Sequence, residues 1–220
     1  CEKYMGKFPV ISVTLKGVSA MDFAGAKAML RTIIGNEAMR FRYLMDSPKL
    51  ADDEKESYRQ LITVDPTGRQ KFSMSDDMLT DSLRTLSGLL RKHFDQKPIL
   101  LIDEYDVPLD KAQQYGYYDE MVTLIRNLFG QALKTNDSLY FAVLTGCLRI
   151  ARESIFTGLN NLKVFSVTDS RFASWFGFTA DDVKQLLNYY QLEEKFELIR
   201  EWYDGYRFGD TEVYCPWDVI

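Results

Sequence analysis

Apolar positions along the chain alternate between a strand-like and a helical spacing. Residues 8–15 are rich in branched apolar side chains and follow the β-strand pattern. A helical spacing of apolar positions follows a capping-box-like pair, Ser19 and Asp22, and continues to about Leu44. The N-terminal part of the chain is therefore expected to form a strand and then a helix.

The middle of the chain repeats this alternation. The polar stretch 46–72 contains turn residues and predicts an inserted helix within loops, and Ser75 begins a helix with leucines along one face. The run Ile99-Leu100-Leu101-Ile102 is short, wholly apolar and followed by carboxylates, which is typical of a strand buried on both faces. Further elements are expected in the order helix, strand, helix and strand, at 117–134, 139–144, 149–156 and 162–167.

Alternating strands and helices indicate the α/β class, here a parallel sheet with helices on both faces. Towards the C-terminus the pattern changes. Thr179 and Asp182 form a second capping-box-like start, and two short helices are expected at 182–190 and 193–202. We therefore expect two parts, a sheet domain at 1–170 and the start of a small helical subdomain at 171–220.

Composition adds few constraints. The chain is 46% hydrophobic and 27% charged, which is ordinary for a globular protein, and no apolar stretch approaches the roughly 18 residues of a membrane span. A net charge of −5 provides no basic footprint for nucleic acid. The three widely spaced cysteines favour a reducing compartment, which suggests the cytoplasm. The single histidine, His93, excludes a histidine-rich metal site and is expected to complement a helix dipole.

Two adjacent carboxylates, Asp103 and Glu104, follow the apolar run. Ligands of open α/β sheets bind outside the carboxyl ends of the strands, which is where these acids are expected. In an ATPase, Asp103 would hold Mg²⁺ and Glu104 would polarise the water that attacks the γ-phosphate. The alternative is that both acids cap the following helix or face solvent.

Thr145 follows the next expected strand, so its hydroxyl would lie beside the carboxylates if the two strands are neighbours. That position suits a sensor of the γ-phosphate, or else an ordinary helix cap. Arg149 and Arg152 come within the next two turns and could reach a phosphate or a neighbouring subunit. The alternative for both arginines is pairing with surface acids such as Glu153.

A phosphate-binding loop is absent from the sequence. Such a loop needs G-x-x-x-x-G-K-[ST], whose backbone N–H groups and lysine hold the phosphates. Gly6-Lys7 is followed by phenylalanine and has no partner glycine upstream, and no other stretch matches. The chain is therefore expected to contribute only the magnesium side of a nucleotide site.

Several stretches, in order, resemble the bacterial AAA-ATPase-like proteins, a P-loop family often joined to a C-terminal PD-(D/E)XK nuclease-like domain. The first is Ile102-Asp103-Glu104-Tyr105-Asp106 with Pro108-Leu109, and the second begins at Leu144-Thr145-Gly146. The second block continues through Arg149-Ile150-Ala151, Glu153-Ser154-Ile155-Phe156 and Gly158-Leu159-Asn160-Asn161-Leu162. Phe176-Gly177-Phe178-Thr179 and Trp202-Tyr203-Asp204-Gly205-Tyr206 resemble the lid-side signatures, so the resemblance spans roughly 8–220. Cys215 departs from the asparagine usual before Pro216-Trp217.

The resemblance implies roles for three of the matching residues. Asp103 would be the Walker B magnesium residue, Glu104 the catalytic carboxylate and Thr145 a sensor-type residue. Arg149 is a candidate catalytic residue and Arg152 a candidate for binding the nucleotide. Asn160 and Asn161 match a characteristic pair to which no role is assigned.

The resemblance also implies that the P-loop and first strand would precede Cys1 and that the nuclease-like domain would follow Ile220. The chain is then a fragment of an ATPase that uses ATP and Mg²⁺, is inactive alone and binds neither by itself. Without the first strand two strand edges would be exposed, which predicts self-association. The alternatives are a non-catalytic scaffold with an ATPase-derived fold and a nucleic-acid processing factor.

Overall fold

A computed structural model describes residues 4–69, 71–134, 136–147, 155–156 and 162–220. The chain divides into two compact units, Cys1–Asn160 and Asn161–Ile220. The sequence places the boundary near residue 170. Each unit is described below by itself.

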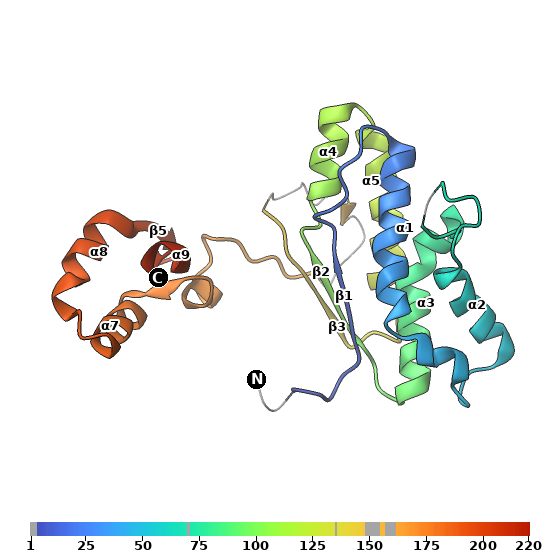
Figure 1. Ribbon diagram of the computed structural model, residues 1–220, viewed down its shortest axis with the longest axis horizontal. Coiled ribbons are helices and arrows are strands. Elements are labelled where there is room, and N and C mark those ends of the chain that lie inside the picture. Colours follow the sequence, from blue (N-terminus) through green and yellow to red (C-terminus); the bar gives the residue numbers. More distant parts are fainter. Residues whose placement is uncertain (1–3, 70, 135, 148–154, 157–161) are drawn as a thin grey trace. The chain divides into compact units, whose positions relative to one another are not determined.

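The first unit is built on a parallel three-stranded sheet (Figure 1). Its strands are β1 (Val10–Thr14), β2 (Ile99–Asp103) and β3 (Phe141–Leu144), in the order β1-β2-β3. The register sets Thr14 beside Asp103 and Ile102 beside Leu144. The three strands therefore end together, and the residues that follow them share one edge of the sheet.

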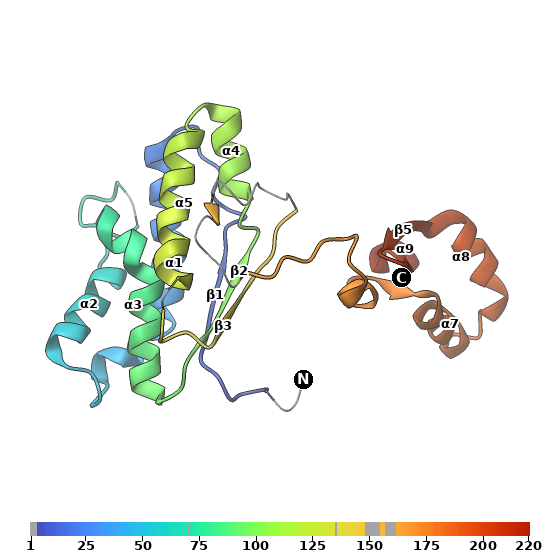
Figure 2. The same ribbon diagram turned by 180° about the vertical axis from the view of Figure 1, so that it is seen from behind.

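Three long helices lie on the same side of this sheet (Figures 1 and 2). They are α1 (Phe23–Met39), α3 (Asp76–Phe94) and α5 (Tyr118–Leu133). Each buries one apolar stripe, and the core also contains the alternate residues of β1 and β2 that face the helices. The main buried side chains are Ile11, Val13, Leu30, Ile34, Leu79, Leu83, Leu86, Leu100, Ile102, Ile125, Leu128 and Phe129.

The starts of two helices follow the capping residues in the sequence. The Asp22 carboxylate accepts a hydrogen bond from Gly25 N, and the Ser75 hydroxyl accepts one from Met78 N. Ser19 is therefore not the N-cap of α1, which begins three residues later than the expected pair implied. The first helix also ends earlier than expected, because a 3₁₀ helix, Arg42–Asp46, replaces its last turn.

Two further helices complete this unit. The expected inserted helix is α2 (Asp52–Ile62), which packs against α3 and α1. The helix α4 (Val107–Tyr115) was not predicted and follows β2 directly. A proline in its first turn and a left-handed Gly116 after its last turn are its sequence signals.

Within the described residues of the first unit, the expectation of helices on both faces of the sheet is wrong. No described helix of the first unit covers the second face of the sheet, where Leu101 is 36%, Val143 43% and Phe141 46% exposed. The apolar run therefore alternates between buried and exposed positions, rather than being buried on both sides. An apolar sequence allows burial of both faces, but covering helices must also be present.

The two edges of the sheet differ. Glu37 of α1 accepts a hydrogen bond from Ser12 N at 2.8 Å and so occupies the outer edge of β1. Among the described residues β3 has no strand on its outer side, and its Ala142 and Leu144 are only half-buried. The predicted self-association concerns this edge and stays a prediction.

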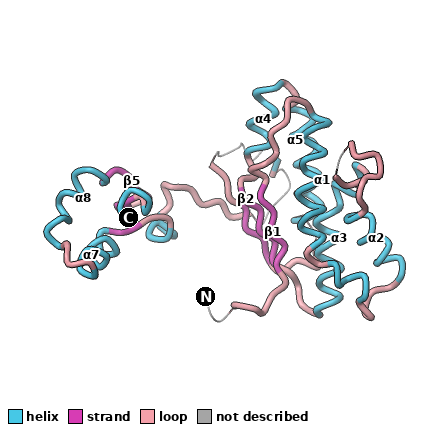
Figure 3. The backbone as a smooth tube through the Cα atoms, viewed as in Figure 1, coloured by secondary structure: helices cyan, strands magenta, loops and turns pink. Residues whose placement is uncertain are grey.

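The second unit combines the expected helices with a small antiparallel sheet, which the sequence did not predict. The sheet order is β4 (Phe178–Thr179), β6 (Thr211–Tyr214), β5 (Asp204–Phe208), drawn as magenta segments in Figure 3. The glycine-rich tail forms a hairpin because Gly209 adopts a left-handed φ of 54° between β5 and β6. The other elements are 3₁₀ helices Ser170–Trp175 and Glu193–Lys195 and helices α7 (Ala180–Tyr189), α8 (Phe196–Tyr203) and α9 (Pro216–Val219).

The second unit has its own core of Val183, Leu187 and Tyr214, on which Phe178 and Phe196 pack. The Thr179 and Asp182 capping box at the start of α7 is present as predicted. No helix in the described parts of the chain is long and apolar enough to cross a membrane.

The strand expected at 162–167 does not form. These residues have no regular structure and lead into a turn in which Asp169 N donates to Ser166 O at 2.9 Å. Val167 O accepts from Gly209 N at 2.8 Å, a bond to the β5–β6 turn instead of a strand ladder. Most of the helix expected at 149–156 lies outside the described residues.

Candidate functional site

The carboxyl edge of the parallel sheet brings Asp103 and Thr145 into contact. The Thr145 hydroxyl donates a hydrogen bond to Asp103 Oδ1, although 42 residues separate the two in the chain. The backbone fixes this approach, because Thr145 N donates to Ile102 O at 2.9 Å and Tyr105 N donates to Thr145 O at 3.1 Å. Both side chains are exposed, so the pair is accessible to a ligand.

Glu104 has an unusual backbone. Its φ of 53° lies in the left-handed region, which costs a residue with a β-carbon about 1–2 kcal/mol. The turn that follows β2 imposes this conformation. Strain of this kind persists where the surrounding structure requires it, and such residues gather at functional sites.

Lys16 contributes a charge that the sequence did not predict. Its Nζ lies 3.9 Å from Glu104 Oε1, and the Glu104 side chain is 30% exposed. The segment after β1 is held here because Leu15 N donates to Asp103 O at 2.8 Å. The ion pair of Lys16 with Glu104 could not be predicted from the sequence, because it forms only when β1 and β2 are neighbours in the sheet.

The donor set at this edge fits magnesium. Mg²⁺ binds oxygen ligands, keeps several waters and commonly takes only one or two protein carboxylates. Asp103 offers an exposed carboxylate and Thr145 a hydroxyl oxygen at its side. Among the described residues there is no group of three or more His, Cys, Asp and Glu side chains that could hold a metal ion. The described residues at this edge therefore do not form a metal site made of protein ligands alone.

The two arginines expected to act with this edge are Arg149 and Arg152. Both lie outside the described residues, as do Asn160 and Asn161. Their roles stay predictions.

The single histidine belongs to a structural contact. His93 Nδ1 lies 2.8 Å from Ser47 Oγ, and Ser47 is only 1% exposed. A serine this deeply buried is closed to substrates. The pair joins the last turn of α3 to the end of the 3₁₀ helix Arg42–Asp46.

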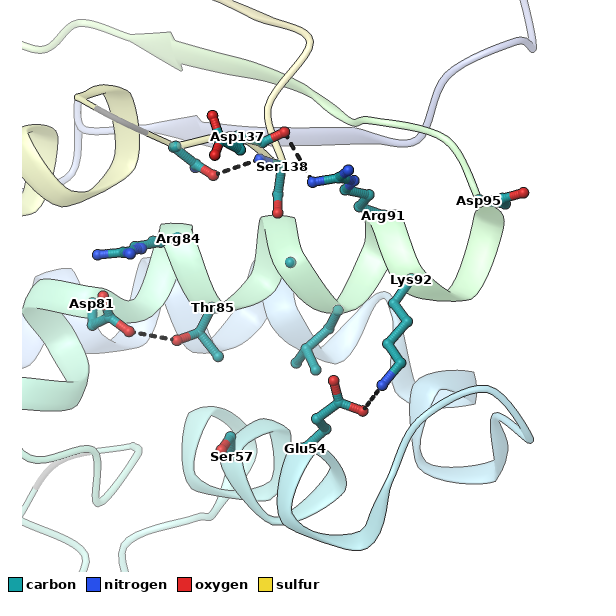
Figure 4. Close-up of a pocket in the computed structure, with 13 residues that line it drawn as sticks. Glu54, Ser57, Asp81, Arg84, Thr85, Arg91, Lys92, Asp95, Asp137 and Ser138 are labelled. Carbon is teal, nitrogen blue, oxygen red and sulfur yellow. Dashed lines mark hydrogen bonds and ion pairs between the residues drawn. The ribbon is translucent and has the colours of Figure 1, made fainter.

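A groove of about 720 Å³ lies elsewhere on the first unit, between α2, α3 and the loop before β3 (Figure 4). Two of its cations are bound within it: Lys92 pairs with Glu54 at 2.7 Å, and Arg91 donates to the backbone oxygen of Asp137 at 3.1 Å. Because Asp137 precedes β3 whereas Thr145 follows it, the groove is at the opposite end of the strands from the Asp103–Thr145 pair.

The fold is mixed α/β, with a parallel sheet and an acidic residue bound to a hydroxyl at its carboxyl edge. A family model described as "Predicted AAA-ATPase" matches residues 2–156. This is more than half of the chain, and the chain therefore belongs to the AAA-ATPase-like family.

A curated relative is the "Uncharacterized protein in vnfD 5'region" of Azotobacter chroococcum mcd 1. It is 33% identical over 126 residues, which cover 57% of this chain and 24% of that protein. The matched part thus spans about a quarter of the relative's length. No solved structure matches the chain.

Proposed function

We propose that this chain carries the magnesium and water-activating side of an ATP-hydrolysing site, and that the intact protein is a Mg²⁺-dependent ATPase. The observation that carries the proposal is the hydrogen bond from Thr145 to Asp103 at the carboxyl ends of two adjacent parallel strands, in a chain of the AAA-ATPase-like family. The three cysteines and the family resemblance lead us to propose a cytoplasmic bacterial protein.

Each residue at this edge has a distinct role in the proposal. Asp103 would hold Mg²⁺, with water completing the shell, and the ion would neutralise charge on the phosphates. Glu104 accepts a proton from the attacking water, and the turn after β2 orients its carboxylate. Thr145 orients Asp103 and contacts the terminal phosphate or the water. We propose Arg149 and Arg152 as cations for the phosphates.

The phosphate-binding side of the site must come from elsewhere, because the sequence contains no G-x-x-x-x-G-K-[ST]. We therefore expect the 220-residue chain to bind Mg-ATP weakly or not at all. Titration calorimetry of this chain with Mg-ATP tests the expectation, and micromolar binding would contradict it.

The decisive experiment uses the full-length protein. Glu104→Gln removes the proton acceptor but keeps the size of the side chain, so ATP hydrolysis should fall by at least roughly 100-fold while nucleotide binding persists. Glu120→Gln, an exposed substitution in the first turn of α5, is the matched control and should leave turnover unchanged. Equal turnover of Glu104→Gln and the wild type would exclude Glu104 as the catalytic carboxylate. Absence of hydrolysis in the wild type would instead favour a non-catalytic scaffold.

A further inference from the structure

The turns that follow β2 and β3 continue the pairing of the two strands beyond the sheet. Two backbone bonds join them, from Thr145 N to Ile102 O at 2.9 Å and from Tyr105 N to Thr145 O at 3.1 Å. A third bond uses a side chain: Cys147 N donates to Asp106 Oδ2 at 3.1 Å. The Asp106 carboxylate therefore takes the place of the next carbonyl in the ladder.

Asp106 occupies the N-cap position of α4, where an aspartate ordinarily accepts a bond from the first turn of its own helix. Its side chain makes no such capping bond. It reaches across to the segment after β3 and is 3% exposed, unlike the exposed Asp103 and Thr145. Burial of a carboxylate is costly without hydrogen bonds, so its contact with the Cys147 amide indicates a specific use.

Gly146 makes this approach possible. A β-carbon at position 146 would lie 2.6 Å from Asp106 Oδ1 and 2.8 Å from Cε1 of the Tyr105 ring, closer than such contacts allow. The Tyr105 ring is fixed in turn by an edge-on contact with Phe156, at 5.3 Å between ring centroids. Asp106 thus lies directly against the backbone that carries Thr145.

We propose that Asp106 is a positioning residue, which holds the segment 145–147 against β2 so that the Thr145 hydroxyl and the Asp103 carboxylate keep a single spacing. The proposal rests on the proposed function, because it assigns a catalytic purpose to that spacing. The proposal has a structural half, the hydrogen bond of Asp106 to the Cys147 amide, which does not depend on any nucleotide. Its catalytic half is the effect of this bond on turnover.

The catalytic half is tested by steady-state ATPase kinetics of the full-length protein, well below its melting temperature. Asp106→Ala removes the acceptor and should lower kcat at least tenfold, with KM for ATP changed less than threefold. Asp106→Asn keeps an oxygen acceptor of the same size and should restore most of kcat. Asp110→Ala, which changes an acid on the same helix that contacts Lys111 and Gln114, should leave kcat unchanged.

The structural half is tested by amide hydrogen exchange of Cys147 in the same variants. Exchange should become at least tenfold faster in Asp106→Ala and stay close to the wild-type rate in Asp106→Asn. An unchanged rate in Asp106→Ala overturns the assignment of the bond. Faster exchange with unchanged kcat overturns the positioning role.

A different variant, Asp103→Ala, distinguishes failure of the proposed function from failure of the role of Asp106. Asp103→Ala should abolish turnover but leave the exchange of the Cys147 amide at the wild-type rate. Undiminished turnover in Asp103→Ala refutes the site itself and, with it, the catalytic purpose of Asp106. Faster Cys147 exchange in Asp103→Ala refutes the view that Asp106 holds the Cys147 amide independently of the Asp103–Thr145 contact.

Discussion

The hydroxyl of Thr145 donates a hydrogen bond to Oδ1 of Asp103 across two adjacent parallel strands. This contact needs three conditions together: a carboxylate that ends β2, a hydroxyl that follows β3, and a register that sets Ile102 beside Leu144. The bond orients a carboxylate that faces solvent and would otherwise be free to rotate. A threonine that served only as a helix cap would bond to its own helix instead.

The first prediction concerns this contact. In the full-length protein, Thr145→Val removes the hydroxyl and keeps the branched shape, so kcat for ATP hydrolysis should fall roughly 100-fold, the effect typical of losing one catalytic hydrogen bond. Thr145→Ser retains the hydroxyl and is the matched control, with kcat expected within about threefold of the wild type. Steady-state kinetics measure both, and equal kcat values for the two variants would show that the hydroxyl is not used.

The strands that build this edge could be predicted because their signals are local. An apolar run followed by Asp103-Glu104 identifies β2, and 139–144 followed by Thr145 contains β3. The carboxyl ends of β2 and β3 were expected to lie close together, because parallel strands of an open sheet end at a common edge. What could not be predicted is the ion pair of Lys16 with Glu104, because it depends on which strands are neighbours.

The elements that were not predicted from the sequence have either a weak local pattern or a structure that depends on distant parts of the chain. The helix α4 has only Pro108, Leu109 and Ala112 buried, so its apolar pattern is too short to show a helical period. The small sheet of the second unit depends on a pairing between distant segments, Phe178 of β4 with Tyr214 of β6, which no local pattern encodes. Exposure of Leu101 likewise depends on which helices exist to cover the sheet, not on the strand itself.

The second prediction uses the strained backbone of Glu104. Glycine adopts a positive φ without a steric penalty, so Glu104→Gly should leave the free energy of unfolding of the 220-residue chain equal or raise it by up to about 1 kcal/mol. Glu120→Gly places glycine in the first turn of α5 and should lower that free energy by up to about 1 kcal/mol. Urea denaturation compares the two. In the full-length protein, Glu104→Gly should also abolish hydrolysis.

The third prediction concerns the packing of α1 on Phe72. A β-carbon at Gly35 would lie 2.4 Å from Cδ2 of the buried Phe72 ring, so the helix and ring cannot both keep their places in Gly35→Ala. We expect a loss of about 1–3 kcal/mol in the free energy of unfolding. Gly130→Ala in α5 meets nothing within 4 Å and should gain up to about 1 kcal/mol from better helix propensity. A destabilisation of the same size in both variants would refute the contact with Phe72.

The fourth prediction is a pH dependence of stability that originates at the start of α3. The hydrogen bond from Lys27 Nζ to Asp76 Oδ2, at 2.6 Å, lowers the pKa of Asp76, and the charges of Lys27 and Arg31 add to this effect. Because the folded pKa is below the unfolded one, Asp76 stabilises the fold fully above about pH 4. The contribution is lost as the pH falls through the folded pKa.

Asp76→Asn should therefore lower stability at neutral pH and flatten its decline between about pH 5 and pH 2. Asp77→Asn is the matched control, since it removes a neighbouring acid from the same helical turn, and should leave the acid decline as steep as in the wild type. Urea denaturation at a series of pH values measures both slopes. The Asp76 carboxylate is largely exposed, so solvent screening limits the size of the effect and the two variants must be compared at one ionic strength. Parallel declines in the wild type and Asp76→Asn would show that the contact with Lys27 does not depend on the charge of Asp76.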